Sequence, residues 1–235
     1  MKNLRIESAI LAVGLALLGV FIYNGINSLA KRDRFVSVRG LAEKEVKADR
    51  VIWPLTYKTV GNDLGAVYRD ISAANRKIAA FLTRNGIKAS DITTGAPMVT
   101  DLWTNEYNDN RNRERYNATA VTTVSSSDVD RVRALMTRTG ELLSEGIAIA
   151  PNDYGPQMQI QFDFTSLNKI KPQMIEQATK NAREAAEKFA KDSGSKLGKI
   201  KSAQQGLFSI DSRDSNTPYI KEVRVVTTVD YYLDN

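Results

Sequence analysis

The residues best suited to chemistry lie in the stretch 104–120, TNEYNDNRNRERYNATA, which is rich in asparagine and arginine. Arg111, Arg113 and Arg115 stand at alternate positions, so an extended backbone would project all three to one side. The aromatic residues that flank them and offer rings for stacking are Trp103, Tyr107 and Tyr116. The pattern predicts a binding site for an anionic ligand such as phosphate, a lipid headgroup, a glycan or a nucleic acid.

Acidic residues in the same stretch support a different interpretation. They nearly cancel the arginine charge and are Asp101, Glu106, Asp109 and Glu114. A solvated hairpin tip, or a contact between subunits, accounts for the same composition without any ligand. From the sequence the three interpretations stay open.

The chain contains no cysteine and no histidine. Thiol nucleophiles, disulfides, Ser-His-Asp arrangements and the usual zinc sites are therefore excluded. Gly40, Gly61 and Gly95 lack the spacing and the following Lys-Ser/Thr of a phosphate loop. Carboxylate-based acid/base chemistry, Lys or Tyr chemistry and an oxygen-ligated cation remain possible by composition, but the sequence shows no recognisable site of this kind, and we predict no catalytic residue, no metal site and no cofactor.

The net charge of +6 comes largely from the N-terminal end. Residues 1–34 hold five of the 33 basic but only two of the 27 acidic residues, which leaves about +3 on the rest. Nucleic-acid-binding domains usually carry a stronger and more clustered positive charge. No nucleic-acid partner is expected.

Residues 8–30, SAILAVGLALLGVFIYNGINSLA, carry no charge. As a helix they would reach about 35 Å, enough to cross a hydrocarbon core of about 30 Å. Lys2 and Arg5 precede them, as in an export signal. We predict that 1–34 is a signal anchor or signal peptide, with the rest tethered to the inner membrane on its periplasmic side. The alternative is cleavage before Lys31 and release into the periplasm.

Residues 35–235 form the predicted domain. Alternating or continuous apolar runs predict strands, and a three-to-four-residue apolar spacing predicts helices. The helices are expected at 62–86, 128–146 and 168–194, and the resulting order is ββαββαβαββ. The predicted fold class is α+β, an antiparallel sheet or sheets packed by about three helices.

The sequence also contains a weak internal repeat, here called the internal echo. Val-Thr-Thr-Val occurs at 121–124 and at 226–229, each time after a helix, a glycine and a strand. Two related halves that share one sheet would explain the echo; the alternative is that strand sequences often look alike.

Four segments resemble one family in order and spacing. They are VSVRGLAEKEVKADRVIW (36–53), GIKASDITTGAPMVTDLW (86–103), YNATAVTTV (116–124) and AREAAEKFAKDSGSKLGKIKSAQQG (182–206). Together they resemble the SIMPL-domain family, bacterial envelope proteins that include the periplasmic immunogenic proteins. The likeness covers about 35–233. It departs at Ala48, where the family often has proline, and in the Asn/Arg-rich loop.

The resemblance implies an α+β domain, ring-like oligomers for some members, no established enzymatic activity, and an association with envelope integrity and stress tolerance. We therefore predict a non-enzymatic envelope protein that self-assembles through its sheet edges and hairpins into a homo-oligomeric scaffold and contacts the membrane through residues 8–30. The alternative is a module that binds an anionic envelope ligand through 104–120.

Overall fold

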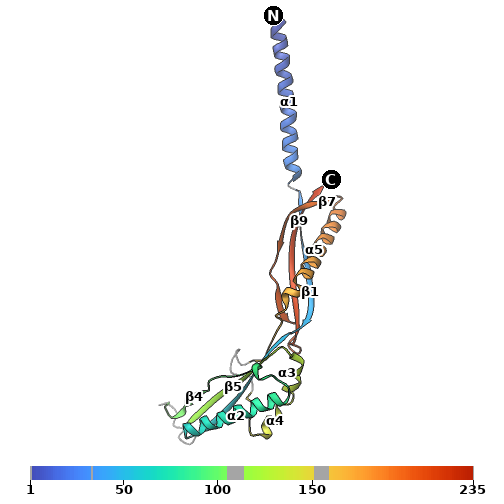
Figure 1. Ribbon diagram of the computed structural model, residues 1–235. Coiled ribbons are helices and arrows are strands. Elements are labelled where there is room, and N and C mark those ends of the chain that lie inside the picture. The colour runs from blue at the N-terminus through green and yellow to red at the C-terminus, as the bar shows by residue number, and fades with distance from the viewer. Residues whose placement is uncertain (1, 33, 105–113, 151–158, 235) are drawn as a thin grey trace. The chain divides into compact units, whose positions relative to one another are not determined.

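The computed structural model describes residues 2–32, 34–104, 114–150 and 159–234. The chain divides into two compact units. The first comprises Met1–Lys44, Asn168–Ile210 and Glu222–Asn235, and the second comprises Glu45–Leu167 and Asp211–Lys221. Each unit has its own sheet and its own long helix (Figure 1).

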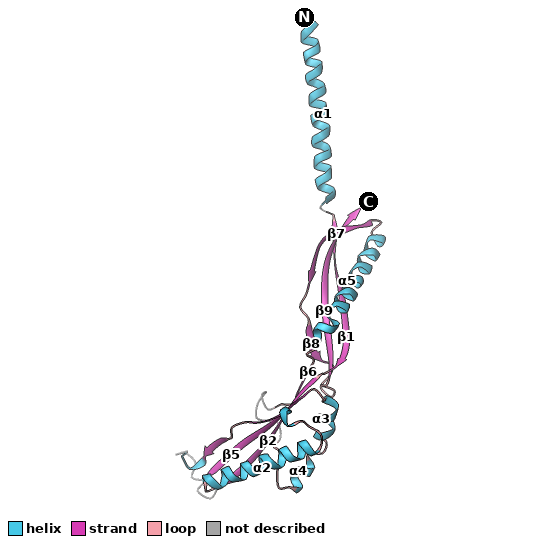
Figure 2. Ribbon diagram, viewed as in Figure 1, coloured by secondary structure: helices cyan, strands magenta, loops and turns pink. Residues whose placement is uncertain are grey.

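The described helices and strands alternate along the chain (Figure 2). The α-helices are α1 (Lys2–Arg32), α2 (Leu64–Arg84), α3 (Val129–Met136), α4 (Gly140–Ser144) and α5 (Leu167–Asp192). The strands are β1 (Phe35–Lys47), β2 (Arg50–Gly61), β3 (Ile92–Thr94), β4 (Met98–Asp101), β5 (Tyr116–Ser126), β6 (Gln161–Asp163), β7 (Lys196–Gln205), β8 (Ser209–Ser212) and β9 (Ile220–Asp234).

The predicted α+β class with antiparallel pairing is confirmed, but the predicted element order is wrong in three places. The helix expected at 128–146 is two helices, interrupted at residues 137–139, where the Thr137 and Thr139 hydroxyls bond to carbonyls three residues earlier. The arm expected at 91–103 divides into β3 and β4 before and after Pro97, which cannot donate to a ladder. The loop expected after β7 contains a further strand, β8.

The second unit is built around the long antiparallel pair β2 and β5. Its sheet has the order β3-β5-β2-β6, and β4 pairs with the other end of β5. One face of α2 covers this sheet and buries Val67, Ile71, Ile78, Phe81 and Leu82. The helix begins where the Asp63 side chain accepts a hydrogen bond from the Ala66 N–H.

The first unit packs α5 against a sheet of order β1-β9-β7, with β8 also pairing β9. The helix buries a row of small residues at four-residue spacing, Met174, Ala178, Ala182, Ala186 and Ala190. This row allows the backbone of β1 to approach closely. The three-to-four-residue spacing of the sequence predicts that Ala185 and Phe189 also lie on the buried side of this helix; that prediction is wrong, because both are exposed and Ala190 takes the inner position.

The internal echo has a structural counterpart. α2 leads through β3 and β4 to β5, as α5 leads through β7 and β8 to β9, and in each series the last strand pairs with both earlier strands. The first valine of each Val-Thr-Thr-Val accepts a hydrogen bond from a glycine N–H, Gly95 to Val121 at 3.0 Å and Gly206 to Val226 at 2.8 Å. The two halves therefore repeat one plan, although each has its own sheet and they do not share one.

Within the described part of the chain, no helix is both long enough and apolar enough to cross a membrane. The predicted transmembrane helix is not confirmed.

Candidate functional site

Arg115 is the best-defined member of the predicted ligand site, and it is bound from several sides. Its Nε and Nη2 atoms lie 2.9 and 2.8 Å from Asp101 Oδ2. Its backbone N–H donates to Asn62 Oδ1 at 2.9 Å, and its carbonyl accepts from the Leu102 N–H at 2.7 Å. The register of β4 and β5 explains the ion pair, because Asp101 lies directly opposite Tyr116.

Aromatic rings complete this cluster. The guanidinium carbon of Arg115 lies 4.9 Å from the centre of the Tyr116 ring and 5.6 Å from the centre of the Trp103 ring. The hydrogen bond from Arg115 holds the pKa of the Asp101 carboxyl below its usual range. The charge of Arg115 is thus compensated within the chain. This residue acts as a clamp between the two strands at the end of the β4–β5 ladder that is next to the connecting loop, here called the hairpin base.

Three further residues of the predicted site, Tyr107, Arg111 and Arg113, lie outside the described residues. The structure therefore brings together Trp103, Arg115 and Tyr116. The anion-binding prediction for the whole set stays a prediction.

An apolar groove of about 430 Å³ lies between α2 and β4. Its lining includes Leu64, Tyr68, Pro97 and Val99. The three-to-four-residue spacing of apolar residues predicts that Leu64 lies on the buried side of the helix, but its side chain is 49% exposed. Helical spacing identifies the face on which a residue lies, and it does not reveal how much of that side chain the facing elements cover.

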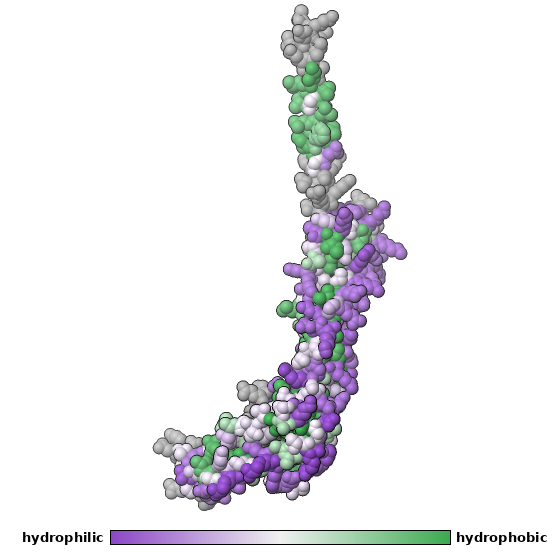
Figure 3. Space-filling model, viewed as in Figure 1, coloured by the Kyte–Doolittle hydropathy of each residue, from purple (hydrophilic) through white to green (hydrophobic). Residues whose placement is uncertain are grey.

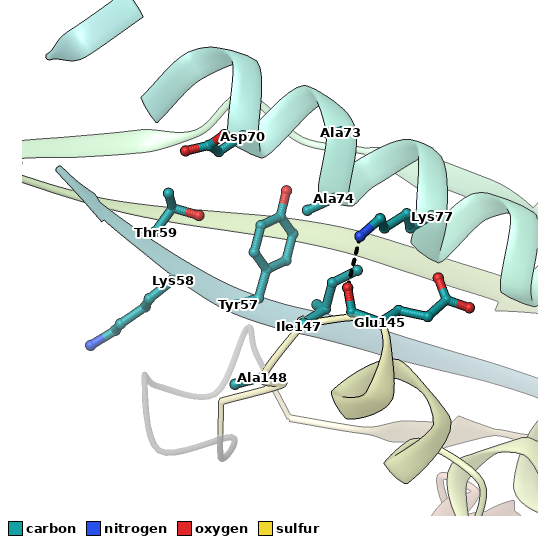
Figure 4. A pocket seen from close by; sticks show the side chains of 11 residues that line it. Tyr57, Lys58, Thr59, Asp70, Ala73, Ala74, Lys77, Glu145, Ile147 and Ala148 are labelled. Atoms are coloured by element: carbon teal, nitrogen blue, oxygen red, sulfur yellow. Dashed lines mark hydrogen bonds between the residues drawn. The ribbon is translucent and has the colours of Figure 1, made fainter. Parts of the chain in front are cut away.

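A second cavity, of about 380 Å³, lies between β2, α2 and the segment after α4 (Figure 4). Tyr57 forms one wall, and its hydroxyl lies 2.9 Å from Asn75 Oδ1 and 3.0 Å from the Ile71 carbonyl oxygen. Lys77 donates to the Glu145 carbonyl at 2.7 Å, the bond drawn in Figure 4. Sequence reasoning missed this cavity, because its lining is assembled from three separate segments.

The chemistry of this cavity is that of polar binding. Burial raises the pKa of Tyr57 to about 12, so its hydroxyl stays protonated near neutral pH. Asp70 and Lys77 line the cavity from the same helix, seven residues apart, and therefore about 10 Å apart along its axis. Among the described residues, no group of three or more acidic side chains is placed to hold a metal ion.

The first strand of the domain offers a different kind of site, an open sheet edge. At its two ends the Leu233 N–H donates to the Arg34 carbonyl at 3.0 Å and the Ala48 N–H donates to the Tyr219 carbonyl at 2.8 Å. Glu43 lies 3.5 Å from Arg224 in the same register. Both backbone bonds use even-numbered residues, so the N–H and C=O groups of the odd-numbered residues of β1 point away from β9.

The opposite edge of this sheet is protected. β7 departs from regular register between Leu197 and Ile200 and again between Ile200 and Ser202. It also carries Lys196, Lys199 and Lys201. Bulges and lysines are the usual devices that discourage edge-to-edge pairing. β1 carries lysines too, Lys44 and Lys47, but its bonds to β9 at both ends fit one register, so of the two edges β1 is the better suited to receive another strand.

No curated protein matches the chain. A family model described as SIMPL, protein of unknown function (DUF541), matches residues 36–230. This range includes the whole second unit and those parts of the first unit that lie between residues 36 and 230, and it confirms the resemblance seen in the four sequence segments. The chain belongs to the SIMPL family.

Proposed function

We propose that this protein is a non-enzymatic scaffold of the cell envelope that assembles from copies of itself through the open edge of β1. One observation carries the proposal: β1 is 13 residues long, has backbone bonds at both ends that fit one register with β9, and ends its sheet among the described residues. Strands average five or six residues, and unprotected edges are usually shorter still. A long, regular, open edge is therefore best explained by a strand that pairs with it.

Hydrogen-bond energetics support this interpretation. An edge N–H or C=O already bonds to water, so each bond formed with a partner strand contributes only about 0.5–1.5 kcal/mol. Several such bonds along one edge are enough for association when symmetry repeats the contact around an assembly. A scaffold built in this way needs no catalytic residue.

Attachment to the inner membrane, with both units on the periplasmic side, is part of the proposal. It is supported by α1, whose described apolar side chains are strongly exposed, from 54% at Leu17 and Ile22 to 73% at Phe21 (Figure 3). Apolar surface of this extent normally contacts lipid or protein. The alternative is a cleaved form released into the periplasm, and N-terminal sequencing of the protein isolated from cells distinguishes the two.

The test is the mass of the full chain in a mild nonionic detergent, measured by size-exclusion chromatography with light scattering at low and high salt. The informative variant is Ser37→Pro, because residue 37 directs its N–H to the open edge and proline removes that donor without touching the bonds to β9. Ser37→Ala is the matched control, since both variants lose the hydroxyl that bonds to Asp230.

We expect the unchanged protein and Ser37→Ala to form one discrete assembly, and Ser37→Pro to run as a smaller species. An unchanged protein that stays monomeric at every concentration and salt level would remove the scaffold proposal. A Ser37→Pro variant that assembles normally would show that assembly does not use this edge.

A further inference from the structure

We infer that the partner of β1 is the β1 strand of a second copy, in antiparallel register about a two-fold axis at Leu41. This inference rests on the proposed function and specifies the contact. A two-fold axis uses the same surface on both copies, so the edge must be complementary to itself. Strand length, charge and apolarity can each be checked for that property.

Strand length selects the register. Leu41 is the midpoint of β1, Phe35–Lys47. Only the register with Leu41 opposite Leu41 overlaps the whole strand in both copies. A shift by two residues places Leu41 opposite Arg39 or Glu43 and leaves strand ends unpaired.

The charges fit the same register. With Leu41 on the axis, Arg39 faces Glu43 of the second copy, and symmetry repeats the pair on the other side. Both side chains are exposed, and both belong to odd-numbered residues, which share one face of the strand. Directly opposite residues have Cβ atoms about 4.5–5.5 Å apart, within reach of an ion pair. Glu43 also lies 3.5 Å from Arg224 of its own chain, so it would stand between two guanidinium groups.

The axis itself is apolar. Leu41 is half-buried in the single chain, and pairing brings it against its own copy. Its carbonyl oxygen accepts a hydrogen bond from Asn181 Nδ2 at 2.7 Å. A carbonyl oxygen accepts two hydrogen bonds, so the N–H of the second Leu41 can share it. In the single chain, Asn181 satisfies an edge group that β9 does not reach.

The arrangement has a geometric consequence. Antiparallel pairing separates the N-terminal ends of the two β1 strands by about 40 Å. Both N-terminal segments reach the same bilayer only when the paired strands run along its surface.

Disulfide trapping tests the register directly, because the chain has no cysteine of its own. In Leu41→Cys, the two sulfurs would meet at the axis, with Cα atoms about 5.5 Å apart, a separation that a disulfide spans. In the control Ser37→Cys, the two cysteines would lie eight residues apart along the paired strands, about 27 Å. Full-length Leu41→Cys in detergent should oxidise to a covalent dimer. Full-length Ser37→Cys should form no more disulfide-linked dimer than the background level.

Charge reversal tests the ion pairs. Arg39→Glu places two carboxylates opposite each other on both sides of the axis, and we expect it to weaken dimerisation roughly tenfold or more. The double variant Arg39→Glu with Glu43→Arg restores opposite charges and should recover most of the affinity. Arg76→Glu is the control, because it makes the same charge change on an exposed position of α2.

The outcomes separate this inference from the proposal beneath it. Cross-linking of Leu41→Cys but not of Ser37→Cys, with rescue by the double variant, supports the two-fold contact. An unchanged protein that assembles while Leu41→Cys fails to cross-link overturns the register and leaves the scaffold proposal standing. Head-to-tail pairing of β1 with β7 would give this second result. An unchanged protein that never assembles overturns both.

Discussion

Gly40 of β1 and Ala178 of α5 approach so closely that a Cβ atom on Gly40 would lie 1.9 Å from the Ala178 carbonyl oxygen. The same Cβ atom would lie 2.4 Å from the Ala182 backbone nitrogen. Both neighbours are helix backbone, so neither can rotate away as a side chain would. The row of alanines on α5 and the glycine on β1 therefore form one close contact between strand and helix.

Gly40→Ala should destabilise the first unit strongly. One methyl group inserted into a packed core typically costs about 1–3 kcal/mol, and contact with backbone places this site at or above the upper end. A lower urea midpoint measured by circular dichroism would report the loss. The control is Gly140→Ala at the start of α4, where a Cβ atom meets nothing within 4 Å. We expect that variant to be neutral or slightly more stable, and equal losses in both would contradict the close contact.

Tyr57→Phe should cost about 1 kcal/mol, the typical net worth of one buried hydrogen bond. The loss is moderate because Asn75 Oδ1 keeps the second donor, the Thr122 hydroxyl at 3.1 Å. Tyr68→Phe removes a hydroxyl from a tyrosine that is 64% exposed and serves as the control. Urea unfolding of both variants should show a difference only at position 57.

Alkaline pH should weaken the second unit through the same tyrosine. Burial raises the pKa of Tyr57 to about 12 from a usual value of 10.0. A raised pKa means that the unfolded chain loses this proton first, so the associated stability is complete below pH 10 and falls as pH rises towards 12. Unfolding midpoints of the unchanged protein should drop over that interval, and those of Tyr57→Phe should drop less.

The sequence predicted the faces of the elements better than their partners. Alternation in FVSV identified the inner residues Val36 and Val38 of β1, because side-chain direction depends only on strand period. That β1 pairs with β9 on one side and leaves its other edge open depends on a strand almost two hundred residues later. No local pattern encodes such a pairing, so the sequence could predict assembly through sheet edges but not which strand supplies the edge.

The candidate ligand site illustrates the same limit. Arg115 and Asp101 were both recognised, and the sequence alone treated them as charges that cancel on average. The β4–β5 register makes them a specific pair and turns Arg115 into a hairpin clamp. On α5, the many alanines differ little in hydrophobicity from one face of the helix to the other, so the spacing alone favours an inward position for the large Phe189. In the structure the buried four-residue row continues to Ala190 instead.

Arg115→Gln should loosen the base of the β4–β5 hairpin without unfolding the unit. The ion pair is partly exposed, so its contribution to global stability is small. The local effect should be clear, because the Leu102 N–H and Arg115 N–H bonds both depend on the clamp remaining in place. Hydrogen exchange should accelerate at these two amides and stay unchanged in the β2–β5 ladder. Unaltered exchange at both amides would show that the backbone holds the hairpin base unaided.

Asp49→Asn should destabilise the second unit in a manner that depends on pH. The Asp49 carboxylate accepts hydrogen bonds from the Thr165 N–H at 2.6 Å, the Thr165 hydroxyl at 2.9 Å and the Ser166 N–H at 2.9 Å, just before α5 begins. Burial alone would raise the pKa of this carboxyl, but the hydrogen bonds from Thr165 and Ser166 outweigh it and hold the pKa below its usual 3.8.

A lowered pKa means that the unfolded chain takes up this proton first. The stability that Asp49 supplies is therefore complete above about pH 4 and is lost as pH falls through the folded pKa. At pH 7 the replacement should cost about 1–2 kcal/mol, as the loss of a capping carboxylate does. Urea midpoints measured at pH 7, 4 and 3 should differ most between the two proteins at pH 7 and least at pH 3. A difference that stays constant across this range would mean that Asp49 acts through shape and not through its charge.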